Sequence, residues 1–366
     1  MAYEVPFFGP VGPRFFMTIT QSTPDTTHKL HGMLMSPFSM KLRAYLRYRR
    51  IPFQWCNNAR AHEIAMTKVS TYMVPVIEYP DGTFENDSTP IIDKFEENIA
   101  ARRTDPENEA DAFLAYLIED FADEWLLWPF FMHRWRLEAD QKHNSQWILY
   151  EALQGNVHDD DFLAQSEFWT DRQIKGIKSL CGSPDYDALL DDSLQTFLGI
   201  MEKAVSNKLF FFGSRPSRAE IAIYGILSQE IQDLSASSFM YERYRFTTRW
   251  VSIIDDLSGV VGEWEPLSTD TEKLLASPLA EILKLSGKYH LPLLLANEKA
   301  LANGEDVFSF DIDGTAFTRS SHMRHATCLP ALRKRYAQLS GASKDALKTV
   351  LEETNCLMYL ADNGTN

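Results

Sequence analysis

Short apolar runs alternate with helical stripes along the first part of the chain. Residues 28–35 predict a strand, which Ser36 and Pro37 end. A helix follows, because apolar residues recur at the spacing of one helix face, at Phe38, Leu42, Tyr45 and Leu46. Pro37 suits the first turn of that helix, where its missing N–H is not needed. The pattern therefore predicts a strand that leads directly into a helix.

The elements that follow complete a small α/β unit. The pattern predicts, in order, a strand, a short helix, two strands and a third helix, at 53–56, 61–69, 74–79, 83–86 and 88–95. Pro80, Asp81 and Gly82 join the two adjacent strands, and an Asp-Gly pair is a strong hairpin signal. The order is β-α-β-α-β-β-α over residues 28–100, which is the first domain that we expect.

Helices dominate the second expected domain, residues 109–260. A polar segment with a proline, 101–108, forms the linker before it. Ser217 and Glu220 make a capping box in front of an apolar run, so a helix begins there. Residues 155–187 are mostly polar, and we expect surface loops and short helices in that stretch.

The character of the sequence changes again after Pro266. Helical spacing returns in three segments, at 274–303, 329–339 and 344–351. Between them, residues 307–318 alternate around Asp313-Gly314, which predicts a β-hairpin. We therefore expect a small, mostly helical C-terminal extension at 261–366. Residues 1–27, rich in Pro, Ser and Thr, predict an extended N-terminal arm.

Composition and charge narrow the function. The chain has 366 residues and a formal net charge of −15, and so acidic a surface repels the phosphates of a nucleic acid. Its four cysteines lack paired spacing, so we expect no disulfide framework, no metal site and a reducing, cytoplasmic location. We also expect neither a secretory signal nor a membrane partner, because no long apolar run occurs.

Four motifs occur in order along residues 28–256. They are SPFSMKLR at 36–43, MVPVI at 73–77, ENDSTPII at 85–92 and GSRPSRAEIA at 213–222. Together they resemble the thiol-site serine, the cis-proline segment, the acid–serine motif and the capping signature of serine-type glutathione transferases. The resemblance implies a thioredoxin-like, glutathione-binding N-terminal domain, an all-helical C-terminal domain and a homodimer. It also implies that glutathione is the co-substrate.

The chemistry of Ser36 agrees with this resemblance. A free thiol has a pKa of about 8.5, so little of it is thiolate at neutral pH. A hydroxyl at a helix N-terminus can donate a hydrogen bond to the sulfur, and the helix dipole favours the negative charge. Ser36 is placed for this catalytic role. The alternatives are that Ser36 is an ordinary helix cap, or that the nearby Ser39 acts instead.

The resemblance also implies how glutathione is held. A cis Val74–Pro75 bond would turn the Val74 backbone towards the cysteinyl part of the peptide, which pairs like an extra strand. Asp87 would bind the γ-glutamyl ammonium and Ser88 the carboxylate, although a turn and a helix cap are their simpler roles. The family often has Glu where Asp87 stands. Phe38, next to the serine, completes the expected glutathione site.

The sequence does not assign a single role to several other residues. The glycine carboxylate of glutathione needs a basic residue, for which the sequence offers three without preference: Arg60, His62 and Lys68. Lys41 and Arg43 are expected to support the fold. An aromatic stripe opens the helical domain, at Tyr116, Phe121, Trp125, Phe131 and Trp135, and most of it is expected to be core. Within that stripe, Tyr116 and Trp125 are weak candidates for a hydrophobic electrophile pocket.

Acidic residues suggest two further interpretations. Asp120, Asp123 and Glu124 lie on the aromatic helix, and we expect them to be solvated rather than catalytic. Asp311 to Thr315 (DIDGT) matches the nucleophile motif of haloacid-dehalogenase-type phosphatases. Too few residues follow for that domain, so the hairpin interpretation is stronger.

Two functions remain open from the sequence. One is a glutathione transferase whose thiolate attacks a hydrophobic electrophile, either by conjugation or by reductive cleavage of an ether or halide. The other is a binding or structural protein that keeps the fold without turnover. Ser36, Val74–Pro75 and Asp87–Ser88 favour the enzyme. The extension either closes over the electrophile pocket or covers a surface used for dimer contacts.

Overall fold

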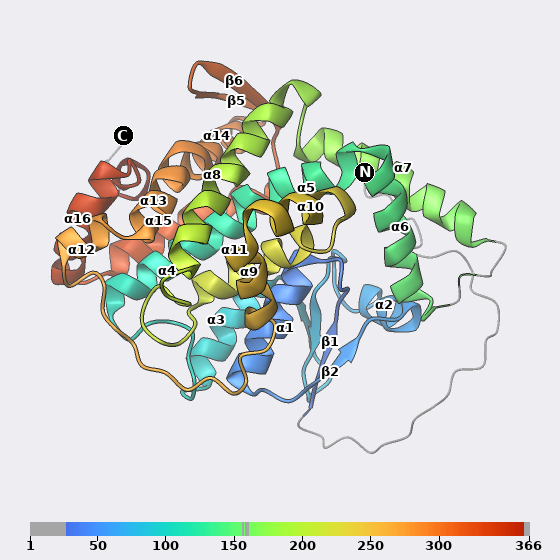
Figure 1. Ribbon diagram of the computed structural model, residues 1–366, viewed down its shortest axis with the longest axis horizontal. Helices are drawn as coiled ribbons and strands as arrows, with labels where there is room; N and C mark the ends of the chain where they lie inside the picture. Colours follow the sequence, from blue (N-terminus) through green and yellow to red (C-terminus); the bar gives the residue numbers. More distant parts are fainter. Residues whose placement is uncertain (1–26, 156, 158–160, 362–366) are drawn as a thin grey trace.

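The computed structural model describes residues 27–155, 157 and 161–361. Apart from Thr27, the expected N-terminal arm lies outside these ranges. Figure 1 shows an α/β sheet domain on one side of the molecule and layers of helices on the other. No helix within the described ranges is both long enough and apolar enough to cross a membrane.

The sheet domain has the predicted element order. Its strands are β1 (His28–His31), β2 (Phe53–Cys56), β3 (Val76–Glu78) and β4 (Phe84–Asn86), and its helices are α1 (Pro37–Arg49), α2 (Ala59–Met66) and α3 (Ser88–Asn98). The strands lie in the order β2-β1-β3-β4. β1 pairs parallel with β2 and antiparallel with β3, and β3 and β4 form the predicted hairpin. This is the expected thioredoxin-like arrangement.

The register of the sheet brings distant segments to one edge. His31, at the end of β1, pairs with Val76, at the start of β3, and Val76 pairs with Asn86, at the end of β4. The chain that leaves β1, the chain that enters β3 and the chain that leaves β4 therefore meet at the same edge. These segments carry the first three sequence motifs.

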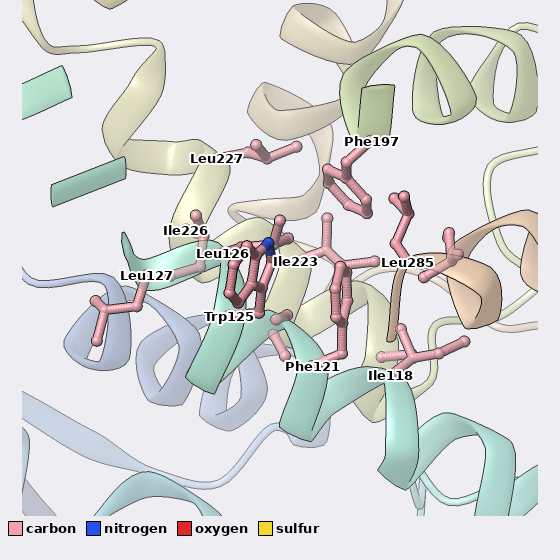
Figure 2. Packing of buried hydrophobic residues seen from close by; sticks show 14 of the residues in the cluster. Ile118, Phe121, Trp125, Leu126, Leu127, Phe197, Ile223, Ile226, Leu227 and Leu285 are labelled. Atoms are coloured by element: carbon pink, nitrogen blue, oxygen red, sulfur yellow. The ribbon is translucent and has the colours of Figure 1, made fainter. Parts of the chain in front are cut away.

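The helical part wraps a large apolar core. Its helices are α4 (Glu109–Phe121), α5 (Leu127–Arg136), α6 (Glu138–Ala152), α7 (Phe162–Leu180), α8 (Asp187–Val205), α9 (Arg218–Glu230), α10 (Leu234–Arg243) and α11 (Arg245–Ile254). A π-helical turn, Ala122–Leu126, joins α4 to α5. Figure 2 shows Phe121 and Trp125 among apolar residues from α8 and α9, so this part of the aromatic stripe is core. The predicted capping box of α9 is present.

The expectation of loops and short helices at 155–187 is wrong. Helix α7 spans most of this stretch, from Phe162 to Leu180. Most residues of this helix are polar, but it has a narrow apolar face made of three buried residues: Phe162, Trp169 and Ile177. The spacing of these three residues places them on one side of the helix. Tertiary packing of this narrow face thus stabilises a helix that could not be recognised from its largely polar composition.

The C-terminal extension packs on the helical part rather than standing apart. It contains α12 (Thr271–Leu275), α13 (Pro278–Leu285), α14 (Leu291–Asn303), β5 (Val307–Ile312), β6 (Thr315–Ser320), α15 (Cys328–Gln338), α16 (Gly341–Glu353) and α17 (Leu357–Leu360). The hairpin around Asp313-Gly314 is confirmed, with β5 and β6 antiparallel. Helices α15 and α16 contact α4, and buried residues of the extension share the core of α4 to α11. The extension therefore covers one face of α4.

A glycine permits the closest packing between the sheet domain and the helical part. A Cβ added at Gly225 on α9 would lie 2.7 Å from the Pro37 carbonyl oxygen and 3.0 Å from the Lys41 Cβ on α1. Gly225→Ala is expected to lower the free energy of unfolding by about 1–3 kcal/mol, because α1 must move. Chemical denaturation measures this change.

Gly199 provides the matched control. It lies within α8, where an added Cβ would have no heavy atom within 4 Å. Gly199→Ala is expected to raise the free energy of unfolding by up to about 1 kcal/mol, because alanine favours a helix. If both substitutions had the same effect, close packing at Gly225 would not be what limits that position.

Candidate functional site

Ser36 caps helix α1 and keeps its hydroxyl hydrogen free. Its Oγ accepts a hydrogen bond from the Ser39 N–H at 3.2 Å. Within the described part of the chain, the Ser36 hydroxyl donates to no acceptor. The capping and thiol-binding roles are therefore compatible, because the oxygen serves the helix while the hydrogen can be donated to a ligand.

A cavity of about 310 Å³ lies beside Ser36, and we call it the aromatic cavity. Most of its lining is apolar or aromatic, from the sheet domain and from α5, α6 and α7: Met33, Met35, Phe38, Leu127, Phe130, Phe131, Trp135, Ile148 and Trp169. Its charged lining residues are arginines: Arg134, Arg172 and Arg324. The cavity thus offers a hydrophobic site next to the serine hydroxyl.

Ser39 is less suited to act on a ligand. Its side chain is fully buried, and its Oγ accepts a hydrogen bond from the Met33 N–H at 3.3 Å. Ser39 lines neither this cavity nor the one described next. Of the two serines that the sequence left open, only Ser36 reaches a cavity.

A second cavity, of about 430 Å³, lies on the other side of Phe38 and Val74, and we call it the acidic cavity. It is lined by the segment before β3, the start of α3, α4 with the π-helical turn that follows it, and the extension. The lining carboxylates are Asp87, Asp93, Asp120, Asp123 and Glu124. Phe38, Val74 and the arginine of the extension, Arg324, line both cavities.

Apart from Ser36, which lines the aromatic cavity, the predicted glutathione-binding residues meet in the acidic cavity. The Val74–Pro75 peptide bond is cis, as the sequence predicts, and both residues line the cavity. Asp87 caps α3 with a positive φ of 79°, and its side chain accepts a hydrogen bond from the Thr89 N–H. Ser88 follows at the first turn of α3 and is buried. Burial raises the pKa of Asp87, although Lys41 partly opposes this change.

The acidic residues of α4 and of the π-helical turn that follows it are not solvated, which corrects the expectation from the sequence. Lys41 is fully buried and forms ion pairs with Glu119 at 2.6 Å and Asp123 at 2.5 Å. Asp120 pairs with His290 of the extension at 2.6 Å, and Glu124 pairs with His325 at 2.8 Å. Buried charges need such partners, and most of these partners lie far away in the sequence.

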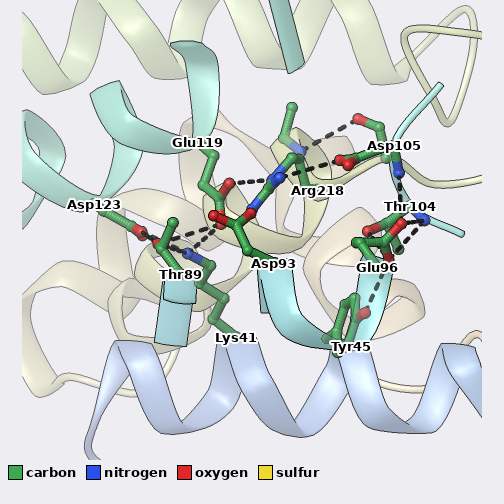
Figure 3. A network of polar contacts seen from close by, with 12 residues as sticks. Lys41, Tyr45, Thr89, Asp93, Glu96, Thr104, Asp105, Glu119, Asp123 and Arg218 are labelled. Atoms are coloured by element: carbon green, nitrogen blue, oxygen red, sulfur yellow. Dashed lines mark hydrogen bonds and ion pairs between the residues drawn. The ribbon is translucent and has the colours of Figure 1, made fainter. Parts of the chain in front are cut away.

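A larger network of buried charges joins the sheet domain to the helical part, as Figure 3 shows. Arg218 on α9 is buried and pairs with Glu119, with Asp93 at 2.8 Å and with Asp105 at 3.2 Å. Arg335 of the extension reaches the same Asp93 at 2.5 Å. The network fixes α3, and with it Asp87 and Ser88, against α4 and α9.

Other predicted residues lie elsewhere. Tyr116 lines the acidic cavity, whereas Trp125 lines neither cavity, because its ring stacks on Tyr289 inside the core. The three candidates for the glycine carboxylate also line neither cavity: Arg60, His62 and Lys68. Within the described ranges, no three His, Cys, Asp or Glu side chains come together as a metal site.

The sequence left open whether the extension reaches the site, and it indicated none of the residues that do. Arg324 and Thr327, in and after the 3₁₀ turn Met323–Ala326, line the acidic cavity together with Cys328 and Ala331 of α15. The guanidinium of Arg324 lies over the Phe38 ring, with its Cζ 4.6 Å from the ring centroid. No motif marks these residues, and only the fold brings them to the site.

Comparison with known proteins gives the family of the sheet domain. Residues 30–103 match the family model described as glutathione S-transferase, N-terminal domain. No curated protein matches the chain significantly.

Several solved structures are similar to the chain at low identity. A glutathione S-transferase from Rhodospirillum rubrum F11 has 16% sequence identity and a TM-score of 0.40, over 62% of this chain and 87% of that chain. A beta-etherase from Sphingobium sp. strain SYK-6 has 13% identity and a TM-score of 0.41, over 62% and 94%. A glutathione transferase family member from Pseudomonas fluorescens Pf-5, solved with bound glutathione, has 14% identity and a TM-score of 0.35, over 62% and 93%.

The family match covers the sheet and its three helices. It includes the segments that carry Ser36, Val74–Pro75 and Asp87–Ser88. Residues 30–103 are therefore similar to the N-terminal domain of glutathione S-transferases.

Proposed function

We propose that the chain is a glutathione-dependent transferase that activates the thiol of glutathione for attack on a hydrophobic electrophile. The observation that carries this proposal is the meeting of Ser36, Val74–Pro75 and Asp87–Ser88 at one edge of the sheet, between two cavities. Conjugation and reductive cleavage of an ether or halide both begin with the same thiolate. The homodimer, the cytoplasmic location and the domain boundaries stay predictions.

The proposed roles follow from charge and geometry. Asp87 binds the ammonium of the γ-glutamyl group, and the Ser88 hydroxyl and N–H at the start of α3 bind its carboxylate. Val74 lines both cavities, and its backbone pairs with the cysteinyl part of the peptide. The thiol then reaches Ser36, whose free hydroxyl hydrogen and helix N-terminus favour the thiolate.

The aromatic cavity supports a hydrophobic second substrate. It adjoins Ser36, and its lining is largely apolar, with no carboxylate among the lining residues. A thiolate held at Ser36 would therefore face an electrophile without repulsion from a nearby acid. The excess of negative charge over the whole chain does not extend to this cavity.

Loss of the charge at Asp87 tests the binding site. Asp87→Asn is expected to abolish retention on immobilised glutathione, because a neutral amide no longer compensates the ammonium. Asparagine keeps the helix-capping oxygen and tolerates the positive φ of this position, so the fold is expected to be kept. Retention of the unaltered protein and of Asp87→Asn is measured side by side.

An exposed acid provides the control for this test. Glu97 on α3 is exposed and lines neither cavity, and Glu97→Gln is expected to leave retention unchanged. Equal retention of Asp87→Asn and the unaltered protein would remove Asp87 from the site. No retention of the unaltered protein would remove the proposed function.

A further inference from the structure

Two charged residues of the acidic cavity, Asp87 and Arg324, differ from the other charged residues that line it. Each of the other four lining acids forms an ion pair with a basic residue. Within the described ranges, Asp87 has no basic group within ion-pair distance. Among the lining residues, Arg324 is the one with an Arg or Lys side chain. The cavity thus presents one unpaired negative group and one available positive group.

The guanidinium of Arg324 is positioned but keeps its hydrogen-bond donors. Its stacking on Phe38 holds it over the first turn of α1. Its closest acid is Glu124, whose Oε2 lies 3.7 Å from the Arg324 Nε and only 2.8 Å from His325. Within the described part of the chain, the guanidinium donates no hydrogen bond to a protein acceptor. A planar group with free paired donors is suited to bind a carboxylate in a bidentate manner.

Arg324 and Asp87 both line the acidic cavity, and their charges influence each other. Burial raises the pKa of Asp87. Three groups act in the opposite direction and lower this pKa: Lys41, the Thr89 N–H and Arg324. The two side chains therefore lie within electrostatic range across the cavity. An ammonium and a carboxylate on the same carbon atom would find complementary charges there.

We propose that Arg324, supplied by the C-terminal extension, binds the α-carboxylate of the γ-glutamyl group together with Ser88, while Asp87 binds its ammonium. This inference rests on the proposed function and deepens it, since it adds a residue outside the N-terminal domain to the glutathione site. The extension is then part of the binding site rather than an appendage. Ligands with a free α-amino-acid group are preferred over analogues that lack the carboxylate.

The test uses the full-length protein and two ligands in calorimetric titrations. One is glutathione, and the other is 4-aminobutanoyl-cysteinyl-glycine, which lacks only the α-carboxylate of the γ-glutamyl group. The unaltered protein is expected to bind the analogue about tenfold to a hundredfold more weakly, the effect of losing charge-assisted hydrogen bonds. Arg324→Gln is expected to lose a similar factor towards glutathione but to bind the analogue like the unaltered protein.

Two further variants make the result specific. Arg324→Lys keeps the charge without the paired donors and is expected to recover part of the loss. Lys334→Gln removes a positive charge from the exposed face of α15 and is expected to change neither affinity.

Three outcomes would overturn the inference. They are equal binding of both ligands by the unaltered protein, an equal loss for both ligands in Arg324→Gln, and no loss for glutathione in that variant. The first comparison needs no variant and so does not depend on how Arg324→Gln folds. Failure of the unaltered protein to bind glutathione at all would instead overturn the proposed function, and the inference with it.

Discussion

Replacing Arg218 with methionine is expected to lower the free energy of unfolding by about 3–5 kcal/mol. The Arg218 side chain is fully buried, and its guanidinium is shared by Glu119, Asp93 and Asp105. Methionine fills much of the same volume but leaves these carboxylates without their common partner in a poorly solvated region. Urea denaturation followed by circular dichroism measures the difference.

Arg335 provides the matched control for that experiment. It also pairs with Asp93, but 35% of its side chain is exposed. Arg335→Met is expected to cost roughly 1 kcal/mol or less, because water screens a surface ion pair and solvates the remaining acid. An Arg218→Met variant no less stable than Arg335→Met would contradict the view that this buried network holds the parts of the chain together.

Ser36→Ala is expected to lower kcat/KM for glutathione-dependent turnover of an aryl halide about 100-fold, while glutathione binding is kept. Removal of one positioned donor to a reacting anion has an effect of this size. Asp87, Ser88 and the Val74 backbone remain in place and still bind the peptide. Initial rates with varied glutathione, together with calorimetric titration of glutathione, separate the two effects.

The loss in Ser36→Ala is expected to depend on pH. A thiol that loses its hydrogen-bond donor titrates closer to its ordinary pKa of about 8.5. The variant should therefore be most impaired below that pH and should recover as the pH rises, because the thiolate then forms without help. Ser39→Ala is the comparison, and it is expected to keep turnover since Ser39 reaches neither cavity. Unchanged turnover in Ser36→Ala would assign the thiol to another group.

Local signals explain which elements could be predicted from the sequence. The Asp81-Gly82 and Asp313-Gly314 turns, the Ser217 capping box and the strand–proline–helix order around Ser36 each depend on neighbouring residues only. Such features can be recognised from the sequence because the residues that form a turn or a helix cap are only a few positions apart. The β-hairpins and the start of α1 followed directly from them.

Features that depend on distant partners could not be predicted. Helix α7 could not be predicted because its buried face is sparse. The sequence also suggests that Asp120, Asp123 and Glu124 are solvated, because their partners come from α1 and the extension. The role of Arg324 could not be predicted either, because only the packing of the extension on α4 brings this residue to Phe38. The sequence therefore indicates the site residues of the sheet domain, but not which residues of the C-terminal extension line the cavities.

Titration of the thiol of bound glutathione shows whether Ser36 stabilises the thiolate. The thiolate absorbs in the ultraviolet, so its formation can be followed as pH rises with the protein saturated by glutathione, for the unaltered protein and for Ser36→Ala. If Ser36 activates the thiol, the thiol pKa is expected to lie well below about 8.5 in the unaltered complex and to return towards that value in the variant. An unaltered complex whose thiol titrates like free glutathione would contradict the claim that Ser36 activates it.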